Sequence, residues 1–236
     1  MRGVVLHVLR YKEDSLIADI FTERYGTVAF LVRVPRQRKP TLRTQLLRPL
    51  NILEVTFDMR QTQSLQRLKE MHVAVPYASL PYEPVKETLA LFLSEVLRYA
   101  LRHEANNEPL MQFLIHSFRW LDDAQGAVSN FHIVFLLQLT HYLGIQPDLQ
   151  DGDGTQYFDF SDGCLRPQMP LQGHSLAPDE ARLLPLLLRL QYRSMHLLRL
   201  SREQRVRILD LIIMYYRLHV AEFPELKSLA ILHEVW

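Results

Sequence analysis

The chain has 236 residues, of which 48% are hydrophobic and 22% charged, which excludes a disordered polymer and allows a sizeable core. Its net charge of +1 hides an asymmetry, because residues 1–80 carry +6 and residues 81–236 carry −5. One cysteine, Cys164, excludes an intramolecular disulfide and any zinc site built from several cysteines. No apolar run approaches the ~20 residues that span a bilayer, and no signal peptide opens the sequence, so we expect a cytoplasmic protein.

The first part of the chain is rich in short apolar segments with strand-like character. We expect strands at residues 3–10, 15–22, 27–34, 50–59 and 64–73. In the last of these, apolar residues are spaced by three, which also suits a helix. Five short strands in about 75 residues favour a small closed barrel, such as the oligonucleotide/oligosaccharide-binding (OB) fold. Another small barrel without a ligand would show the same pattern.

A basic stretch separates the third and fourth predicted strands. It holds six positive charges and no negative one: Arg33, Arg36, Arg38, Lys39, Arg43 and Arg48. Pro35 and Pro40 disfavour helix, so the stretch is predicted to be an exposed, extended loop. Such a loop can lay several cations along nucleic-acid phosphates. A solvated loop without a partner, or one that binds an acidic tail of another protein, fits the same residues.

Aromatic residues of the predicted barrel fall into two groups. Phe21, Phe30 and Phe57 lie within strands and are predicted to be core residues. Tyr11 and Tyr25 lie in turns and are candidates for stacking on nucleic-acid bases.

Three prolines, Pro76, Pro81 and Pro84, mark a change in character. We expect a domain boundary here, with an OB domain at residues 1–78 and a helical domain at 79–236. Helical spacing covers residues 85–105, 108–124, 128–143, 181–200, 202 to about 223 and 225–235. Residues 146–173 form an irregular insert with a small hairpin near Gly163. The predicted fold class is therefore α+β, an N-terminal five-stranded OB barrel followed by a mainly helical domain.

The motifs of common catalytic sites are missing from the sequence. It has no nucleophile elbow, no phosphate-binding glycine loop and no metalloprotease motif. The segment 151–155 resembles the start of a calcium loop, but Gln156 stands where the loop needs glycine, so an ordinary turn is the alternative. We expect no cofactor, no metal and no enzymatic activity. A hydrolase would have to rest on scattered His, Asp and Glu residues.

Several blocks of the sequence resemble a known family, the bacterial recombination mediator RecO. They are residues 3–26, the basic stretch to Arg43 with residues 47–50, the Tyr-Tyr-Arg at 215–217, and residues 224–229 near the end of the chain. The order of barrel, helices, variable insert and helices also matches. Many members carry a glycine just before the basic run, where this chain has Arg33-Val34-Pro35. Some carry four zinc-binding cysteines in the insert, which here holds only Cys164, so this would be a zinc-free member.

The resemblance implies a non-enzymatic DNA repair protein of the RecFOR pathway. Such a protein binds single- and double-stranded DNA, anneals complementary strands, engages the tail of single-strand-binding protein (SSB) and works with RecR to load RecA. By position, Arg36, Arg38, Lys39 and Arg43 would contact phosphates, with Arg33 and Arg48 in support. The family reads the SSB tail with basic residues and an apolar groove in the helical domain. Arg217 and Lys227 are candidates for that role, and structural salt bridges are the alternative.

Overall fold

The computed structural model describes residues 1–33, 42–126, 128–150, 152–171 and 173–235, without the side chains of Leu42, Arg43 and Val235. The described chain divides into two compact units. The first comprises residues 1–125 with 225–235, and the second comprises residues 126–224. The domain boundary expected near residue 78 stays a prediction.

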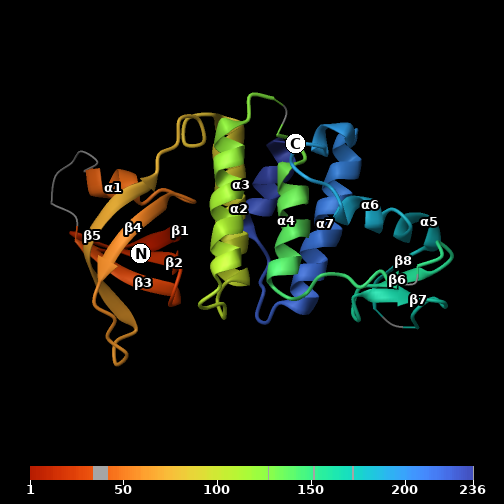
Figure 1. Ribbon diagram of the computed structural model, residues 1–236, viewed down its shortest axis with the longest axis horizontal. Coiled ribbons are helices and arrows are strands. Elements are labelled where there is room, and N and C mark those ends of the chain that lie inside the picture. Colours follow the sequence, from red (N-terminus) through yellow and green to blue (C-terminus); the bar gives the residue numbers. More distant parts are fainter. Residues whose placement is uncertain (34–41, 127, 151, 172, 236) are drawn as a thin grey trace. The chain divides into compact units, whose positions relative to one another are not determined.

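Five strands form the N-terminal barrel: β1 (Arg2–Lys12), β2 (Ser15–Thr22), β3 (Gly26–Arg33), β4 (Ile52–Phe57) and β5 (Leu65–Val75). They pair in the order β1-β2-β3-β5-β4 and close, with β3 and β5 parallel (Figure 1). The predicted OB-type barrel is confirmed. The fifth predicted segment is a strand, although its apolar spacing also suited a helix.

Side chains alternate between the inside and the outside of the barrel. Along β3, buried residues alternate with half-buried ones, because successive side chains of a strand point to opposite faces. The interior is formed by Val5, Ala18, Ile20, Val28, Phe30, Val32, Leu47, Leu53 and Val55. Phe21 and Phe30 are fully buried and Phe57 packs against this core, so the predicted core role of all three is confirmed.

The C-terminal part of the basic stretch departs from the expected extended loop. Residues Leu42–Leu46 form a short helix, α1. Pro35 and Pro40 both precede it, so neither removes a hydrogen bond from its interior. Leu46 and Leu47 pack against the barrel core, which gives this turn of helix an apolar anchor.

Three longer helices belong to the same unit as the barrel: α2 (Pro84–Ala100), α3 (Glu108–Asp123) and α8 (Lys227–Val235). Helix α2 packs against β1 and against α8. The Glu95 carboxylate on α2 accepts hydrogen bonds from the backbone N–H groups of Lys227 (3.1 Å) and Ser228 (2.8 Å). These N–H groups at the start of α8 have no acceptor within the helix itself, so a negatively charged side chain is favourable there.

The turn between β2 and β3 also contacts the segment that follows α2. Gly26 has φ of +66°, and a Cβ there would lie 2.1 Å from the carbonyl oxygen of Glu104. Only glycine allows both this backbone conformation and this approach. Next to it, the Thr27 hydroxyl donates to the carbonyl of Leu101 at 3.3 Å.

A buried carboxylate holds the connection between barrel and helices. Asp122, near the end of α3, accepts hydrogen bonds from the backbone N–H groups of Ala78 (2.8 Å), Ser79 (2.8 Å) and Leu80 (2.6 Å). The Lys86 ammonium, 2% exposed, donates to the Ser79 hydroxyl (2.6 Å) and to the carbonyls of Asp122 (3.1 Å) and Ala124 (2.8 Å). Burial by itself raises the pKa of Asp122. The four hydrogen bonds from residues 78–80 lower the pKa by more than burial raises it, so it lies below its ordinary value.

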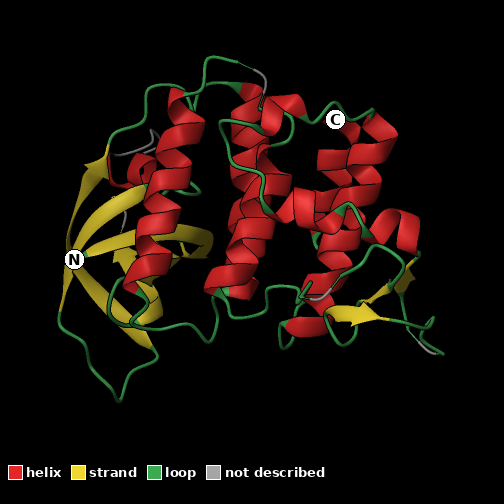
Figure 2. Ribbon diagram, turned by 45° about the vertical axis from the view of Figure 1, so that its right-hand side comes forward, coloured by secondary structure: helices red, strands yellow, loops and turns green. Residues whose placement is uncertain are grey.

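The second unit contains two longer helices, α4 (Phe131–Tyr142) and α7 (Arg202–His219), with shorter elements between them. These are β6 (Tyr157–Asp159), β7 (Cys164–Arg166), β8 (Ser175–Leu176), α5 (Pro178–Ala181), α6 (Leu184–Leu188) and the 3-10 turn η1 (Met195–Leu197). The strands form a small sheet in the order β7-β6-β8, drawn in yellow in Figure 2. The hairpin predicted near Gly163 is therefore confirmed as β6 and β7.

The helix predicted at residues 181–200 is wrong. This segment is broken into α5, α6 and η1. Pro185 lies within it, and a proline is tolerated only at the start of a helix, which is where α6 places it. The capping box of Ser201 and Gln204 is present as predicted. Helix α7 begins at Arg202, directly after Ser201, and ends at His219, before the expected end at about Phe223.

The Asp122 network predicts a measurable loss of stability. Changing Asp122 to Asn should lower the free energy of unfolding by about 3 kcal/mol at pH 7, because the backbone donors of residues 78–80, of which Leu80 is buried, lose a charged acceptor. Since the folded-state pKa of Asp122 is lowered, its contribution is present above the ordinary value of 3.8 and is lost as the pH falls through the folded-state pKa. Urea unfolding should therefore show a difference in unfolding free energy between wild type and Asp122→Asn that is smaller below pH 4 than at pH 7.

The neighbouring Asp123 supplies the control because its side chain is exposed. Changing Asp123 to Asn should alter the unfolding free energy by less than about 0.5 kcal/mol. Equal effects of the two changes, or a difference that does not depend on pH, would contradict the role given to Asp122.

Candidate nucleic-acid interface

The structure describes the side chains of only some of the predicted DNA-binding cations. Arg36, Arg38 and Lys39 lie outside the described residues, and of Arg43 only the backbone, within α1, is described. Arg33 ends β3 with its side chain exposed, and Arg48 follows α1, also exposed. The assignment of this set to DNA contact stays a prediction.

Both ends of the basic stretch are fixed to the barrel. At its start, Arg33 pairs with Ser15 in the β2–β3 ladder. At its end, Leu50 is fully buried and takes φ of +62°, a strained conformation for a residue with a side chain. Its N–H donates to the carbonyl of Val5 (2.8 Å), and its carbonyl accepts from the hydroxyl of Tyr77 (3.0 Å). The described flanks of the stretch are therefore rigidly placed at the barrel.

Arg48 contacts the connection that leads from β5 to α2. Its guanidinium donates to the carbonyl of Pro81 at 3.4 Å and lies 6.0 Å from the centre of the Tyr82 ring. Tyr82 is 70% exposed. The sequence analysis used this segment only as a domain boundary and missed the tyrosine, although an aromatic residue between two prolines at a predicted boundary was a usable signal.

The two predicted stacking tyrosines are both exposed. The Lys12 ammonium lies 5.3 Å from the Tyr11 ring centre, and the Tyr25 ring packs edge-on against Phe57 at 5.8 Å. Exposure leaves a ring face available, but base stacking by either residue stays a prediction.

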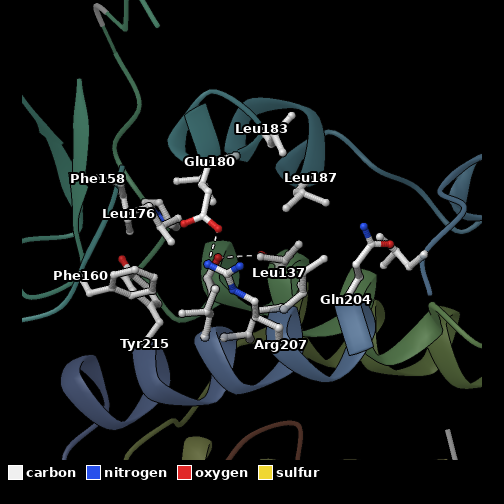
Figure 3. Close-up of a pocket in the computed structure, with 17 residues that line it drawn as sticks. Leu137, Phe158, Phe160, Leu176, Glu180, Leu183, Leu187, Gln204, Arg207 and Tyr215 are labelled. Atoms are coloured by element: carbon white, nitrogen blue, oxygen red, sulfur yellow. Dashed lines mark hydrogen bonds and ion pairs between the residues drawn. The ribbon is translucent and has the colours of Figure 1, made fainter. Parts of the chain in front are cut away.

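The second unit contains an apolar pocket of about 270 Å³. Figure 3 shows its walls, which come from α4, the small sheet, α5, α6 and α7. Leu183 and Leu187 lie on one side and Phe158 and Tyr215 on another. The charged groups among its lining residues are Glu180 and Arg207, which form an ion pair. Burial raises the pKa of Tyr215 to about 12, so its hydroxyl stays protonated and donates to the carbonyl of Ile145 at 2.8 Å.

One wall of this pocket belongs to a second basic segment that the sequence analysis missed. Residues 182–207 carry seven arginines and one glutamate. Arg189, Arg193 and Arg199 are exposed and form no ion pair with a described carboxylate. The net charge of −5, summed over all of residues 81–236, hid this basic segment. A running count of charge over shorter windows would have found it.

The residues predicted to bind a partner tail are not brought together within one unit. Arg217 is exposed on α7 in the second unit, and Lys227 is exposed at the start of α8 in the first. Neither lines the pocket. Their proposed role stays a prediction.

The described residues include no group of three or more His, Cys, Asp or Glu side chains that could hold a metal ion. In the calcium-like segment, Asp153 accepts from the backbone N–H (2.8 Å) and the hydroxyl (2.7 Å) of Thr155, as in an ordinary Asx turn. His132 is buried on the apolar helix α4. No helix in the described ranges is long and apolar enough to cross a membrane.

Taken together, the closed β1-β2-β3-β5-β4 barrel, its basic stretch and the helices after it define an OB-fold protein with a helical extension. Two family models cover nearly the whole chain: "Recombination protein O N terminal" matches residues 1–77, and "Recombination protein O C terminal" matches residues 82–230. The chain belongs to the RecO family of DNA repair proteins.

Curated relatives match over almost their full length. "DNA repair protein RecO" of Phocaeicola vulgatus is 44% identical over 234 residues, which cover 99% of this chain and 97% of the relative. The protein of the same name from Bacteroides fragilis is 44% identical over 237 residues, with the same coverage. That from Porphyromonas gingivalis is 35% identical over 234 residues and covers 96% of this chain and 94% of the relative.

Proposed function

We propose that this protein is a non-enzymatic recombination mediator that binds single- and double-stranded DNA and anneals complementary strands. In this proposal it acts in the cytoplasm with RecR to load RecA on DNA covered by SSB. The DNA-binding part of the proposal rests on the basic stretch. This stretch carries six positive charges and is joined at both ends to an OB-type barrel. Family membership supports the assignment to DNA repair.

The proposed DNA contact is electrostatic. Cations along the stretch would neutralise phosphates and release their counterions, which gives affinity with little preference for sequence. Two strands whose charge is neutralised in this way repel each other less. If their bases remain exposed, complementary strands can pair, which is the physical basis of annealing. A protein scaffold whose basic stretch binds an acidic partner tail is the alternative.

We further propose that the apolar pocket of the second unit receives the SSB tail. A tail that is read by basic residues and an apolar groove must itself carry acidic and apolar groups. The pocket offers an apolar cavity of about 270 Å³, and the arginine-rich residues 182–207 form one of its walls. This combination fits such a tail better than Arg217 and Lys227, which lie outside the pocket lining.

The DNA contact is tested by titrating a labelled single strand at several salt concentrations. With about four phosphate contacts, the logarithm of the affinity should fall against the logarithm of the salt concentration with a slope of roughly −3. Changing Arg36, Arg38, Lys39 and Arg43 together to Ala should remove most of that slope and abolish annealing. Fluorescence anisotropy measures the first effect and a two-strand annealing assay the second.

A second quadruple variant separates local contact from net charge. Changing Arg182, Arg189, Arg193 and Arg199 to Ala removes the same charge from the second unit and should leave the slope nearly unchanged. Weak wild-type binding with a flat slope would reject the DNA contact in favour of the scaffold. A slope that is lost only in the second variant would reject the basic stretch as the contact.

The pocket is tested with a matched pair of leucines. Leu183 lines the pocket and is 51% exposed, whereas Leu186 is 58% exposed and does not line it. Changing Leu183 to Glu should weaken binding of a labelled SSB-tail peptide about tenfold or more, because an apolar contact is replaced by a charge that repels acidic groups. The same change at Leu186 should weaken it less than about twofold. Equal effects would exclude the pocket as the tail site.

A further inference from the structure

The geometry points to Tyr82 as a base-stacking platform that works with Arg48 on single-stranded DNA. This inference rests on the proposed DNA binding and adds the nucleobase as a ligand of the β5–α2 connection. Base stacking needs an aromatic ring that is accessible, rigidly held and close to a cation that can reach the backbone. Tyr82 meets each of these conditions.

The ring is accessible because it takes little part in packing. Its 70% exposure is the highest of any tyrosine or phenylalanine in the described part of the chain. A large ring that contributes little to a core needs another reason to be placed on a surface. By comparison, Tyr77 in the same connection is half-buried, and its hydroxyl donates a hydrogen bond to the carbonyl of Leu50.

The backbone beneath the ring is held from two sides. On one side, the N–H groups of residues 78–80 donate to the Asp122 carboxylate. Within the turn, the N–H of Tyr82 donates to the carbonyl of Ser79 at 2.9 Å. On the other side, the Arg48 guanidinium reaches the carbonyl of Pro81. A ring on such a backbone loses little conformational freedom when a base stacks on it.

The nearby cation completes the site. The Arg48 guanidinium lies 6.0 Å from the Tyr82 ring centre, and Arg48 is the last residue of the basic stretch. An arginine beside an exposed aromatic ring can contact a phosphate while the ring accepts the adjoining base. The platform therefore lies beside Arg48, at the described end of the basic stretch.

The test compares Tyr82→Ala with Tyr82→Phe and Tyr82→Trp on two ligands, an oligothymidine and an abasic strand of equal length. Loss of one stacked base should weaken oligothymidine binding by Tyr82→Ala about tenfold, while the Phe and Trp variants retain wild-type affinity. The abasic strand should bind wild type and Tyr82→Ala equally well, since it has no base to stack. The salt slope of Tyr82→Ala should equal that of wild type, because no phosphate contact is lost.

The outcomes separate this inference from the proposed function. If wild type shows the steep salt slope and Tyr82→Ala binds oligothymidine as tightly as wild type, DNA binding stands and the platform is rejected. If Tyr82→Ala weakens both strands alike or changes the slope, the tyrosine acts by holding Arg48, which also overturns the stacking role. If wild type does not bind DNA at all, the proposed function itself fails. Unchanged urea midpoints in the variants would show that an exposed ring was altered without loss of folding.

Discussion

The connection between barrel and helices depends on one buried carboxylate. The Asp122 carboxylate accepts hydrogen bonds from the three backbone N–H groups of residues 78–80. The Lys86 ammonium donates to the backbone carbonyls of Asp122 and Ala124. Without this acceptor, the buried N–H group of Leu80 would be left unsatisfied away from water, which costs more than an ordinary hydrogen bond returns. The network therefore fixes the path of the chain as it leaves the last barrel strand and enters α2.

The segment that Asp122 holds also contacts the candidate DNA surface. Residues 77–82 contact the end of the basic stretch through Tyr77 with Leu50 and through Arg48 with Pro81 and Tyr82. A strained Leu50 is kept in place by these contacts and by its bond to Val5. In the proposed function, Arg33 and Arg48 would bind phosphate from a rigid support, and cations held in this way lose less freedom on binding than cations on a free chain.

The two units offer different kinds of surface. The first presents a basic stretch on a barrel, and the second presents an apolar pocket bordered by an arginine-rich segment. DNA recognition in the proposed function uses charge along an extended surface. Tail recognition uses an apolar cavity with cations beside it. In the proposed function, one chain would hold a nucleic acid and a protein partner through separate physical means.

The sequence by itself determined the strands, the barrel class and the basic stretch, because alternation, proline placement and local charge are properties of neighbouring residues. It also identified the capping box that opens α7. It failed at residues 181–200, where leucine spacing suggested one helix but Pro185 and packing produce short pieces. Only the tertiary structure joined Asp122 to residues 78–80, placed Tyr82 beside Arg48 and closed a pocket from α4, the small sheet and α5–α7. These pairings link residues far apart in the chain, and no local pattern of side chains specifies which distant group will meet them.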